Sequence, residues 1–320
     1  MRLKPASWHD YKLPGMYMMT FTLNPGIMNF STVNGTPKEP QLELTRFGVT
    51  ARELLRDTIK RLPGVYLWRY VFMPDHLHIV ITVTKPLSRS IRTELAIFKK
   101  DCSQAYFELL KADEFVSVFR AGIHDRIIFD QEMLENELNY ISDNPRRLLV
   151  KREMPGLFTR YLHLDIAGVE MAAYGNMFLL RDLQKMAVMV HRASTAEEKG
   201  RDRARWLACA DNGGVLVSPF ISPEEREIRD VALKLGGRII ELRPDGMPER
   251  FKPSGREFEL CRQGRVLLLA PWPDNREHTV TRTEALTLNF YATNVAALGA
   301  EPVALRDYKG YSAAAQAACQ

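Results

Sequence analysis

Two histidines, His76 and His78, stand two residues apart in the segment MPDHLHIVI, which otherwise has the apolar character of a buried strand. Side chains alternate between the two faces of a strand, so both imidazoles project from one face while Leu77 projects from the other. Adjacent imidazoles can hold one divalent metal ion or one phosphate between them. The same spacing also fits two half-exposed histidines on a solvated strand face, and spacing alone leaves that alternative open.

A tyrosine and an asparagine follow further along the chain, in the segment NYISDNPRR. Tyr140 and Asn144 are four residues apart, so both side chains can project from the same face of a helix. Pro145 disfavours helical geometry at Asn144, which predicts that a helix over 131–142 ends there and that the amide reaches outward. A phenol beside a metal ion can act as a nucleophile, whereas in an ordinary amphipathic helix Tyr140 is a packing residue.

Together these segments resemble the single-tyrosine HUH transposases, and most closely the REP-associated tyrosine transposases. The MPDHLH strand, the HDRII segment at 124–128 and the tyrosine segment occur in the family's order, and the resemblance spans about residues 11–162. The chain departs from the family pattern in two places. Asp75 replaces the usual asparagine before the first histidine, and Ser142–Asp143 replaces a more hydrophobic pair, which puts an acid beside Tyr140.

The resemblance implies a metal-dependent enzyme that cuts and rejoins single-stranded DNA beside hairpins through a 5′-phosphotyrosine intermediate. It makes Tyr140 the nucleophile, and it makes His76, His78 and Asn144 catalytic residues that bind a magnesium or manganese ion. The residues expected to contact DNA are Lys99, Lys100, Arg120, Arg126, Arg146 and Arg147. The aromatic residues that could stack on bases are Trp68, Tyr70 and Phe119.

An alternative from another class is a regulatory protein, adapted to a host task, that still binds DNA hairpins and no longer cuts them. The presence of both histidines, the tyrosine and the asparagine favours the enzyme, because a protein that only binds DNA has no physical need for all four. The sequence does not decide between a monomer and a homodimer.

The elements that must position these residues are strands and helices without a regular βαβ order. Strands are predicted over residues 16–23, 66–73 and 76–84. Helices are predicted over residues 49–61, 88–111 and 131–142. The short Pro74–Asp75 link indicates an antiparallel hairpin, and Ser88 is a candidate helix cap. With the family resemblance, this order indicates an α+β domain of ferredoxin-like type over residues 1–162.

The second half has a different rhythm, in which short apolar strands alternate with amphipathic helices. Strands are predicted over residues 177–180, 186–190, 214–218, 238–242 and 265–270. Helices are predicted over residues 196–210, 223–235 and 281–298. This alternation indicates a parallel sheet covered on both faces, and hence a Rossmann-like α/β domain over 163–320.

One segment of the second half could bind an anion, because it leads from a strand into a helix at residues 218–223. Ser222, Pro223 and Glu225 there predict a well-capped helix that needs no ligand. Neither G-x-G-x-x-G nor a phosphate-binding P-loop motif is present, so no dinucleotide or ATP site is expected. The segment weakly resembles the Rossmann-like domains of the DNA-processing protein A and lysine-decarboxylase-like groups. A small-molecule enzyme centred on this domain remains a further alternative.

The composition places the chain among soluble globular proteins, with 320 residues of which 46% are hydrophobic and 26% charged. Residues 1–162 carry 23 basic and 18 acidic side chains, whereas the remainder carries 21 of each. The excess positive charge therefore lies in the first half and indicates a polyanionic partner there. No apolar run suits a membrane helix or an export signal, so the expected location is the cytoplasm. The four cysteines form no metal-binding or disulfide pattern.

Overall fold

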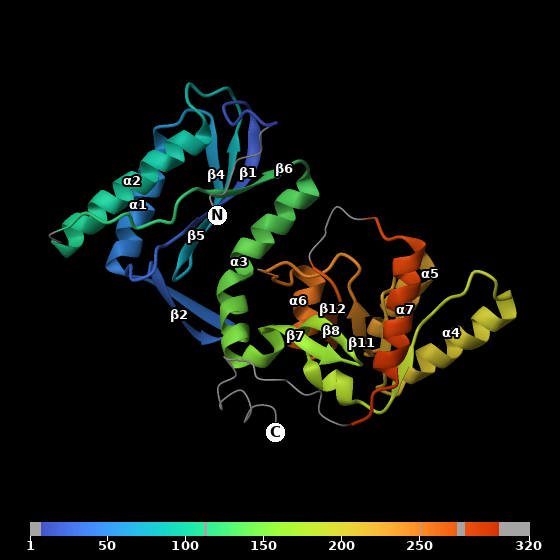
Figure 1. The fold of residues 1–320 in the computed structure, drawn as a ribbon. Helices are drawn as coiled ribbons and strands as arrows, with labels where there is room; N and C mark the ends of the chain where they lie inside the picture. The colour runs from blue at the N-terminus through green and yellow to red at the C-terminus, as the bar shows by residue number, and fades with distance from the viewer. Residues whose placement is uncertain (1–7, 112–113, 250, 274–278, 301–320) are drawn as a thin grey trace. The chain divides into compact units, whose positions relative to one another are not determined.

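The computed structural model describes residues 8–111, 114–249, 251–273 and 279–300 (Figure 1). The chain divides into two compact units, Met1–Arg152 and Glu153–Gln320. This division lies before the boundary that the sequence placed after residue 162.

The first unit is built on a four-stranded antiparallel sheet. In spatial order its strands are β4 (Val65–Phe72), β5 (His76–Val83), β1 (Gly15–Thr22) and β6 (His124–Ile128). The predicted hairpin is confirmed, because β4 pairs antiparallel with β5 across the short Pro74–Asp75 link. A smaller sheet pairs β2 (Ser31–Thr36) with β3 (Glu39–Leu44). The histidine strand β5 is therefore an inner strand, and β4 and β6 are the edges.

Two helices, α1 (Arg46–Lys60) and α2 (Ile91–Leu110), cover one face of this sheet. Ile79 of β5 lies in one apolar cluster with Leu55 of α1 and Phe98 of α2, which confirms the core face expected from side-chain alternation. The cap of α2 is Ser90, not the predicted Ser88. Ser90 immediately precedes the first buried residue of the helix, and its hydroxyl accepts a backbone hydrogen bond from Thr93 (3.1 Å).

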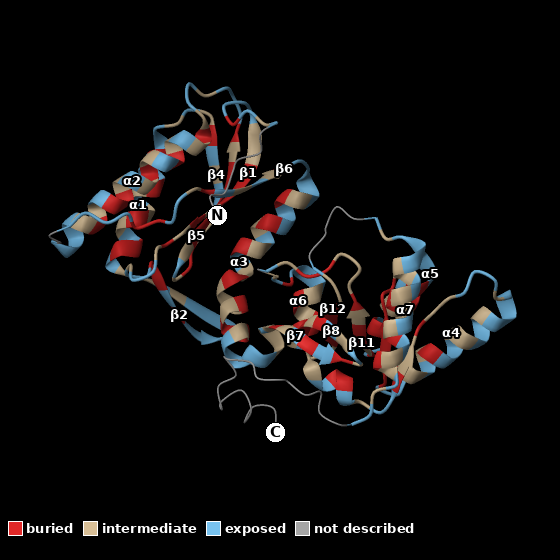
Figure 2. Ribbon diagram, in the orientation of Figure 1, coloured by how far each residue is buried: buried red, intermediate tan, exposed pale blue. Residues whose placement is uncertain are grey.

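A third helix, α3 (Gln131–Glu153), covers the opposite face of the same sheet. Its residues Leu134 and Ile141 lie in an apolar cluster with Val80 of the histidine strand. The Asp130 carboxylate accepts a hydrogen bond from the backbone of the third helical residue (2.7 Å), so it caps α3 as expected. Figure 2 shows buried positions recurring along all three helices. Helices thus lie on both faces of the sheet.

The second unit contains a six-stranded mixed sheet. In spatial order its strands are β7 (Arg160–Ile166), β8 (Val169–Gly175), β12 (Val266–Ala270), β11 (Arg238–Leu242), β10 (Val215–Ser218) and β9 (Lys185–Ala187). The helices are η1 (Pro155–Phe158), α4 (Ala196–Asp211), α5 (Pro223–Lys234), α6 (Gly255–Arg262) and α7 (Arg282–Ala296). The strands β9 to β12 are mutually parallel, whereas β8 and β7 are antiparallel. The parallel strands that the sequence predicted therefore form only part of this mixed sheet.

The four parallel strands follow one another across the sheet in chain order. A doubly wound Rossmann sheet instead reverses its strand order at the point where ligands bind. Without a reversal, crossovers of the usual hand place the connecting helices on one face. Consistent with this, buried residues of α4, α5 and α6 share one cluster with Leu216 and Leu268, while Leu288 of α7 packs with Val217 on the other face.

Two local features of the second unit differ from the sequence interpretation. The hairpin β7–β8 was not predicted, because its turn has Ala167 before Gly168 where an asparagine or aspartate gives the usual signal. Both turn residues have positive φ, 53° and 78°. The strand predicted over 177–180 is wrong, since this segment is the 3-10 helix η2 (Met177–Arg181). Asn176 follows β8, and its side chain accepts a hydrogen bond from the Phe178 backbone at the start of the helical turn (3.0 Å).

The described cysteines are free thiols, as the sequence indicated. Cys102 and Cys261 are buried and Cys209 is half-buried, while Cys319 lies outside the described residues. Burial raises the pKa of the Cys261 thiol to about 12, so this group stays protonated and packs as a small apolar residue. No helix in the described part of the chain is long and apolar enough to cross a membrane.

Gly48 provides a test of how closely α1 packs. A Cβ at this position would lie 1.9 Å from the backbone oxygen of Phe30. We expect Gly48→Ala to lower the free energy of unfolding by about 1–3 kcal/mol through overpacking, as measured by urea denaturation. Gly200, in α4, is a suitable control because nothing lies within 4 Å of the added Cβ. Gly200→Ala should be neutral or stabilise by up to about 1 kcal/mol, and equal losses in both variants would contradict the packing argument.

Candidate active site

The two histidines lie side by side on the face of β5 that α3 covers. Their ring centroids are 4.5 Å apart. His78 is only 6% exposed, and the side chain of His76 is 22% exposed. The alternative of two half-exposed histidines on a solvated strand face is therefore wrong for His78, whereas His76 is partly exposed. The sequence could not exclude it, because the covering helix lies more than fifty residues further along the chain.

A hydrogen bond holds the Nδ1 atom of each imidazole. Nδ1 of His76 lies 2.7 Å from a carboxylate oxygen of Asp75, and Nδ1 of His78 lies 2.7 Å from the hydroxyl of Thr20 on β1. The carboxylate accepts, so Nδ1 of His76 carries the proton. Any metal would consequently be bound through Nε2, and this is how metal-binding histidines are oriented in proteins. Asp75 thus orients the ring of His76.

The helix that carries Tyr140 does not end where the sequence predicted. α3 continues through Pro145 to Glu153, although an internal proline removes one backbone hydrogen bond and costs about 3 kcal/mol. The turns beyond it are held by packing, since Leu149 lies in an apolar cluster with Val33 and Met73. The Arg152 guanidinium also donates to the backbone oxygen of Val33 (2.8 Å). These tertiary contacts outweigh the local preference of the residue before proline.

Asn144 is accordingly buried within the helix, at 7% exposure, and does not reach outward from a helix end. Its amide nitrogen donates a hydrogen bond to the backbone oxygen of Tyr140 (2.9 Å). The two side chains therefore share one helical turn, as their spacing predicted, but the amide of Asn144 partly serves the helix itself.

The phenol of Tyr140 faces the histidine pair. The centroid of the Tyr140 ring lies 5.6 Å from that of the His78 ring. The Arg147 guanidinium lies 5.3 Å from the centroid of the Tyr140 ring. Burial raises the pKa of Tyr140 above its usual value, and the carboxylate of Glu137 raises it further. The Arg147 charge and a hydrogen bond with Asn144 lower the pKa, against the effect of burial. Arg147 thus favours the phenolate that a nucleophilic tyrosine needs.

The acid beside the tyrosine is neutralised locally. The Asp143 carboxylate accepts two hydrogen bonds from the Arg146 guanidinium, the longer of 2.9 Å. The Ser142 hydroxyl bonds to the guanidinium of Arg69 on β4. Ser142 and Asp143 therefore each bond to an arginine, and Arg146 compensates the charge of Asp143.

His124, from the HDRII segment, lies in the same row of the sheet as His78, because both pair with Thr20 across β1. Burial, Arg126 and Arg92 all lower the pKa of His124, so its ring is neutral at neutral pH. The adjacent Asp125 accepts a hydrogen bond from the Tyr11 hydroxyl and pairs with Arg92. Asp125 therefore ties the start of the chain and α2 to β6.

The two imidazoles fit a divalent metal ion that takes its remaining ligands from water and phosphate oxygens. Hydrogen bonds at Nδ1 orient both rings, and the rings lie close enough together for both side chains to bind one metal ion. Within the described residues no group of three or more histidine, cysteine, aspartate or glutamate side chains could hold a metal. The assignment of Asn144 as a third ligand therefore stays a prediction.

The basic residues expected to contact DNA differ in their surroundings. Four of the six are engaged within the unit: Lys99 with the backbone oxygens of Arg120 and Gly122, Arg126 with Glu137, Arg146 with Asp143, and Arg147 with the ring of Tyr140. Lys100 and Arg120 are exposed. Burial lowers the pKa of Lys99, whose two backbone hydrogen bonds of 2.7 Å make it a structural residue.

The aromatic candidates separate in the same way. Phe119 is 2% exposed and belongs to the core, so it cannot stack on a base. Tyr70 faces the core side of β4, where its hydroxyl accepts a hydrogen bond from Arg56 (3.2 Å). Trp68 is 54% exposed. Thr20 and Arg69 were not identified from the sequence, because their roles depend on which strands and helices are neighbours.

The anion site considered in the second unit is occupied by the chain itself. Ser222 caps α5 with Pro223 at its first position, and Glu225 completes the capping box, as predicted. The Glu225 carboxylate is buried and accepts backbone hydrogen bonds from Ser222 (3.0 Å) and Val190 (3.2 Å). A negative group thus already lies where a phosphate would bind, which disfavours a nucleotide site at residues 218–223.

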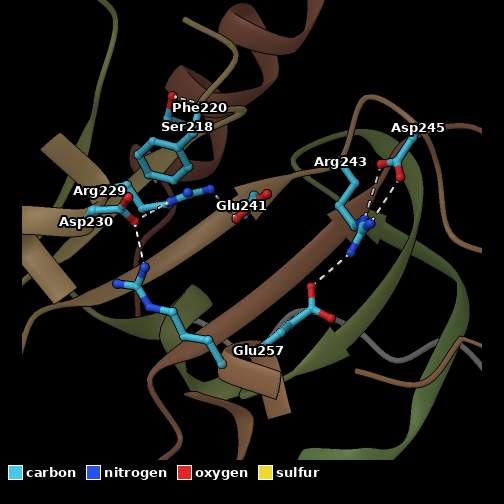
Figure 3. A network of polar contacts seen from close by, with 9 residues as sticks. Ser218, Phe220, Arg229, Asp230, Glu241, Arg243, Asp245 and Glu257 are labelled. Carbon is cyan, nitrogen blue, oxygen red and sulfur yellow. Dashed lines mark hydrogen bonds and ion pairs between the residues drawn. The ribbon is translucent and has the colours of Figure 1, made fainter. Parts of the chain in front are cut away.

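A network of arginines and carboxylates lies beside this segment (Figure 3). Arg243 bonds to Asp245 and to Glu257, at 3.0 Å each, and Arg229 lies 3.7 Å from Glu241. Burial raises the pKa of Glu241, and the two arginines lower it. The acids and bases compensate one another, so the network is a structural feature of this unit.

No protein-family model matches the chain, and no curated protein matches it. Among solved structures, a REP-associated tyrosine transposase bound to a REP hairpin is similar, with 14% identity and a TM-score of 0.33, covering 44% of this chain and 73% of the other. A protein assigned as a transposase from Deinococcus radiodurans R1 is also similar, with 14% identity and a TM-score of 0.26, covering 45% and 98% respectively. These similarities to transposases are distant, and scores below 0.5 do not establish a shared fold.

The electrostatic role of Arg147 can be tested directly. We expect Arg147→Gln to raise the pKa of Tyr140, because the variant removes the cation that stabilises the phenolate. The measurement is ¹⁹F NMR titration of fluorotyrosine-labelled protein without metal, with the Tyr140 signal assigned from Tyr140→Phe. Arg152→Gln, on the same helix, should leave this pKa unchanged. A Tyr140 pKa that falls or stays constant in Arg147→Gln would contradict the assignment.

Proposed function

We propose that the first unit is a metal-dependent transesterase that cuts single-stranded DNA next to a hairpin and joins it to another end. The observation that carries this proposal is the approach of Tyr140 to the oriented pair His76 and His78, with ring centroids 5.6 Å apart at the nearer histidine. A nucleophile, a metal-binding pair and a cation beside the phenol are what phosphodiester transesterification requires. The distant similarity to transposases is compatible with this function.

The reaction would proceed by attack of the Tyr140 oxygen on the scissile phosphorus. The new bond joins the phenolic oxygen to the 5′-phosphate, and the bond to the 3′-oxygen breaks. The phenolic proton is lost to solvent, and the 3′-oxygen leaves as a hydroxyl after taking up a proton from solvent. Attack by another 3′-hydroxyl on the same phosphorus would release Tyr140 and rejoin the DNA. The bond energy is conserved at each step, so neither step needs an external energy source.

The chain's own residues would divide the remaining tasks. His76 and His78 would hold a magnesium or manganese ion, which when bound supplies positive charge at the phosphate. Arg147 would stabilise the phenolate, and Asn144 would hold the tyrosine turn of the helix in place. The exposed residues Lys100 and Arg120 are the candidates for contacts with the DNA backbone.

The nucleophile is tested with a hairpin oligonucleotide taken from the DNA that flanks the gene, labelled at its 3′ end. After incubation with magnesium or manganese, wild type should form a covalent protein–DNA band on a denaturing gel, because the tyrosine bonds to the 3′-labelled fragment. Tyr140→Phe should form none while binding the same DNA, since only the phenolic oxygen is removed. Tyr161→Phe, in the second unit, is the control for loss of a hydroxyl and should retain the adduct.

Each outcome of this experiment has a distinct meaning. An adduct in the Tyr140→Phe protein would refute the choice of nucleophile. Hairpin binding by wild type without an adduct, under both metals, would instead favour the regulatory protein that keeps DNA binding and has lost cleavage.

The role of Asp75 in orienting His76 gives a separate prediction about metal binding. We expect Asp75→Asn to weaken Mn²⁺ binding by roughly 10- to 100-fold, because it removes the negative charge that strengthens His76 as a ligand. Isothermal titration calorimetry of the DNA-free protein measures this directly. Asp143→Asn removes a nearby acid that pairs with Arg146, and it should leave the affinity unchanged. Equal losses in the two variants would indicate a general charge effect.

A further inference from the structure

The edge strand β4 carries two exposed aromatic side chains, Tyr66 at 61% and Trp68 at 54% exposure. The pairing of β4 with β5 is irregular between Leu67 and Arg69, so Trp68 is the extra residue of a β-bulge. Bulges redirect side chains and recur next to active sites. Here the Trp68 indole nitrogen donates a hydrogen bond to the hydroxyl of Thr82 (2.7 Å), which fixes the ring although it is exposed.

This aromatic pair belongs to the same face of the sheet as the histidines. Thr82 and His78 are four residues apart on β5 and point the same way, so they lie about 13 Å apart along the strand. Tyr66 pairs directly with Thr82. Both rings are therefore at the same level of the sheet, beyond the part that carries the candidate active site.

Arg69 lies between the aromatic pair and the tyrosine helix. Its guanidinium donates to the backbone oxygen of Leu138 (3.3 Å) and bonds to the Ser142 hydroxyl, on either side of Tyr140 in the chain. No carboxylate in the described part of the chain forms an ion pair with Arg69. The surface thus combines two flat apolar rings with one positive charge that is not neutralised.

We propose that Tyr66 and Trp68 form a stacking platform for unpaired bases of the DNA strand whose scissile phosphate lies at Tyr140. Arg69 would contact a phosphate of this strand between the stacked bases and Tyr140. This inference rests on the proposed function and specifies which part of the substrate is bound. Fixed, exposed aromatic rings beside a cation suit single-stranded nucleic acid, because every base offers a flat face and every link a negative charge. The bulge interrupts the regular edge of β4 and disfavours the addition of a protein strand there.

The experiment measures the affinity for the hairpin oligonucleotide by fluorescence anisotropy, in a Tyr140→Phe background with magnesium so that the DNA stays intact. Trp68→Ala should weaken binding by roughly 5- to 100-fold, the range expected for one lost base stack. Trp68→Phe should lose much less, because it keeps an aromatic face and removes only the bond to Thr82. Phe290→Ala, at a 62% exposed aromatic residue of α7, should have no effect.

A series of oligonucleotides with one abasic position each identifies the stacked base. At one or two positions near the scissile phosphate, base removal should weaken binding to the Trp68-containing protein and have no further effect on Trp68→Ala. Thermal melting should be the same for Trp68→Ala and Trp68→Phe, which shows that the difference between them does not arise from unfolding.

Three results would overturn the platform. These are unchanged affinity in Trp68→Ala, equal losses in Trp68→Ala and Trp68→Phe, or an abasic pattern that does not depend on Trp68. Sedimentation velocity checks for a protein partner, since a loss of self-association in Trp68→Ala with unchanged DNA affinity would assign the surface to a second copy. The anisotropy assay needs no cleavage, so it tests the platform separately from the transesterase. If the abasic pattern depends on Trp68 but wild type forms no covalent adduct, the platform is retained and the transesterase is rejected. Absence of DNA binding in every protein would reject both.

Discussion

The packing of α3 across the histidine face of the first sheet is the constraint on which the candidate site depends. Without this helix His76 and His78 would face solvent on a strand. With it His78 is buried, and Tyr140 lies against the pair. The packing is strong enough to carry the helix through Pro145, because apolar contacts beyond the proline outweigh the missing backbone bond. A residue that normally ends a helix is thus placed inside one, directly beside the tyrosine turn.

Burial between α3 and the sheet also raises the pKa of Tyr140 and so disfavours its charged form. A buried phenol resists ionisation, and Glu137 adds to the resistance. Arg147 opposes both effects from a position over the ring, and the hydrogen bond with Asn144 acts in the same direction. In the proposed reaction Tyr140 needs additional positive charge, and a metal ion on the neighbouring histidine pair would provide it. The arrangement of Tyr140, Arg147 and the two histidines fits these proposed roles.

In the second unit the capping residues, arginines and carboxylates bond to one another. Its helices α4, α5 and α7 all begin with capping boxes formed by their own residues. In α5, which follows β10, the Glu225 carboxylate accepts a hydrogen bond from the backbone of Ser222. The arginines and carboxylates beside it are mutually paired (Figure 3). The candidate nucleophile and the two histidines lie instead together on one face of the first unit's sheet. This contrast explains why the chemistry proposed for the protein is assigned to the first unit alone.

The sequence by itself identified the candidate site residues and most of the elements that hold them. Alternation along β5 placed both histidines on one face, and the spacing of Tyr140 and Asn144 placed them on one helical turn, because both relations are local. It did not determine where α3 ends, which face α3 covers, or that Lys99 and Phe119 are structural residues. It also missed Thr20 and Arg69, whose partners lie 58 and 73 residues away in the chain. Those relations depend on strand order and helix packing, which arise from contacts between distant segments and leave no local pattern.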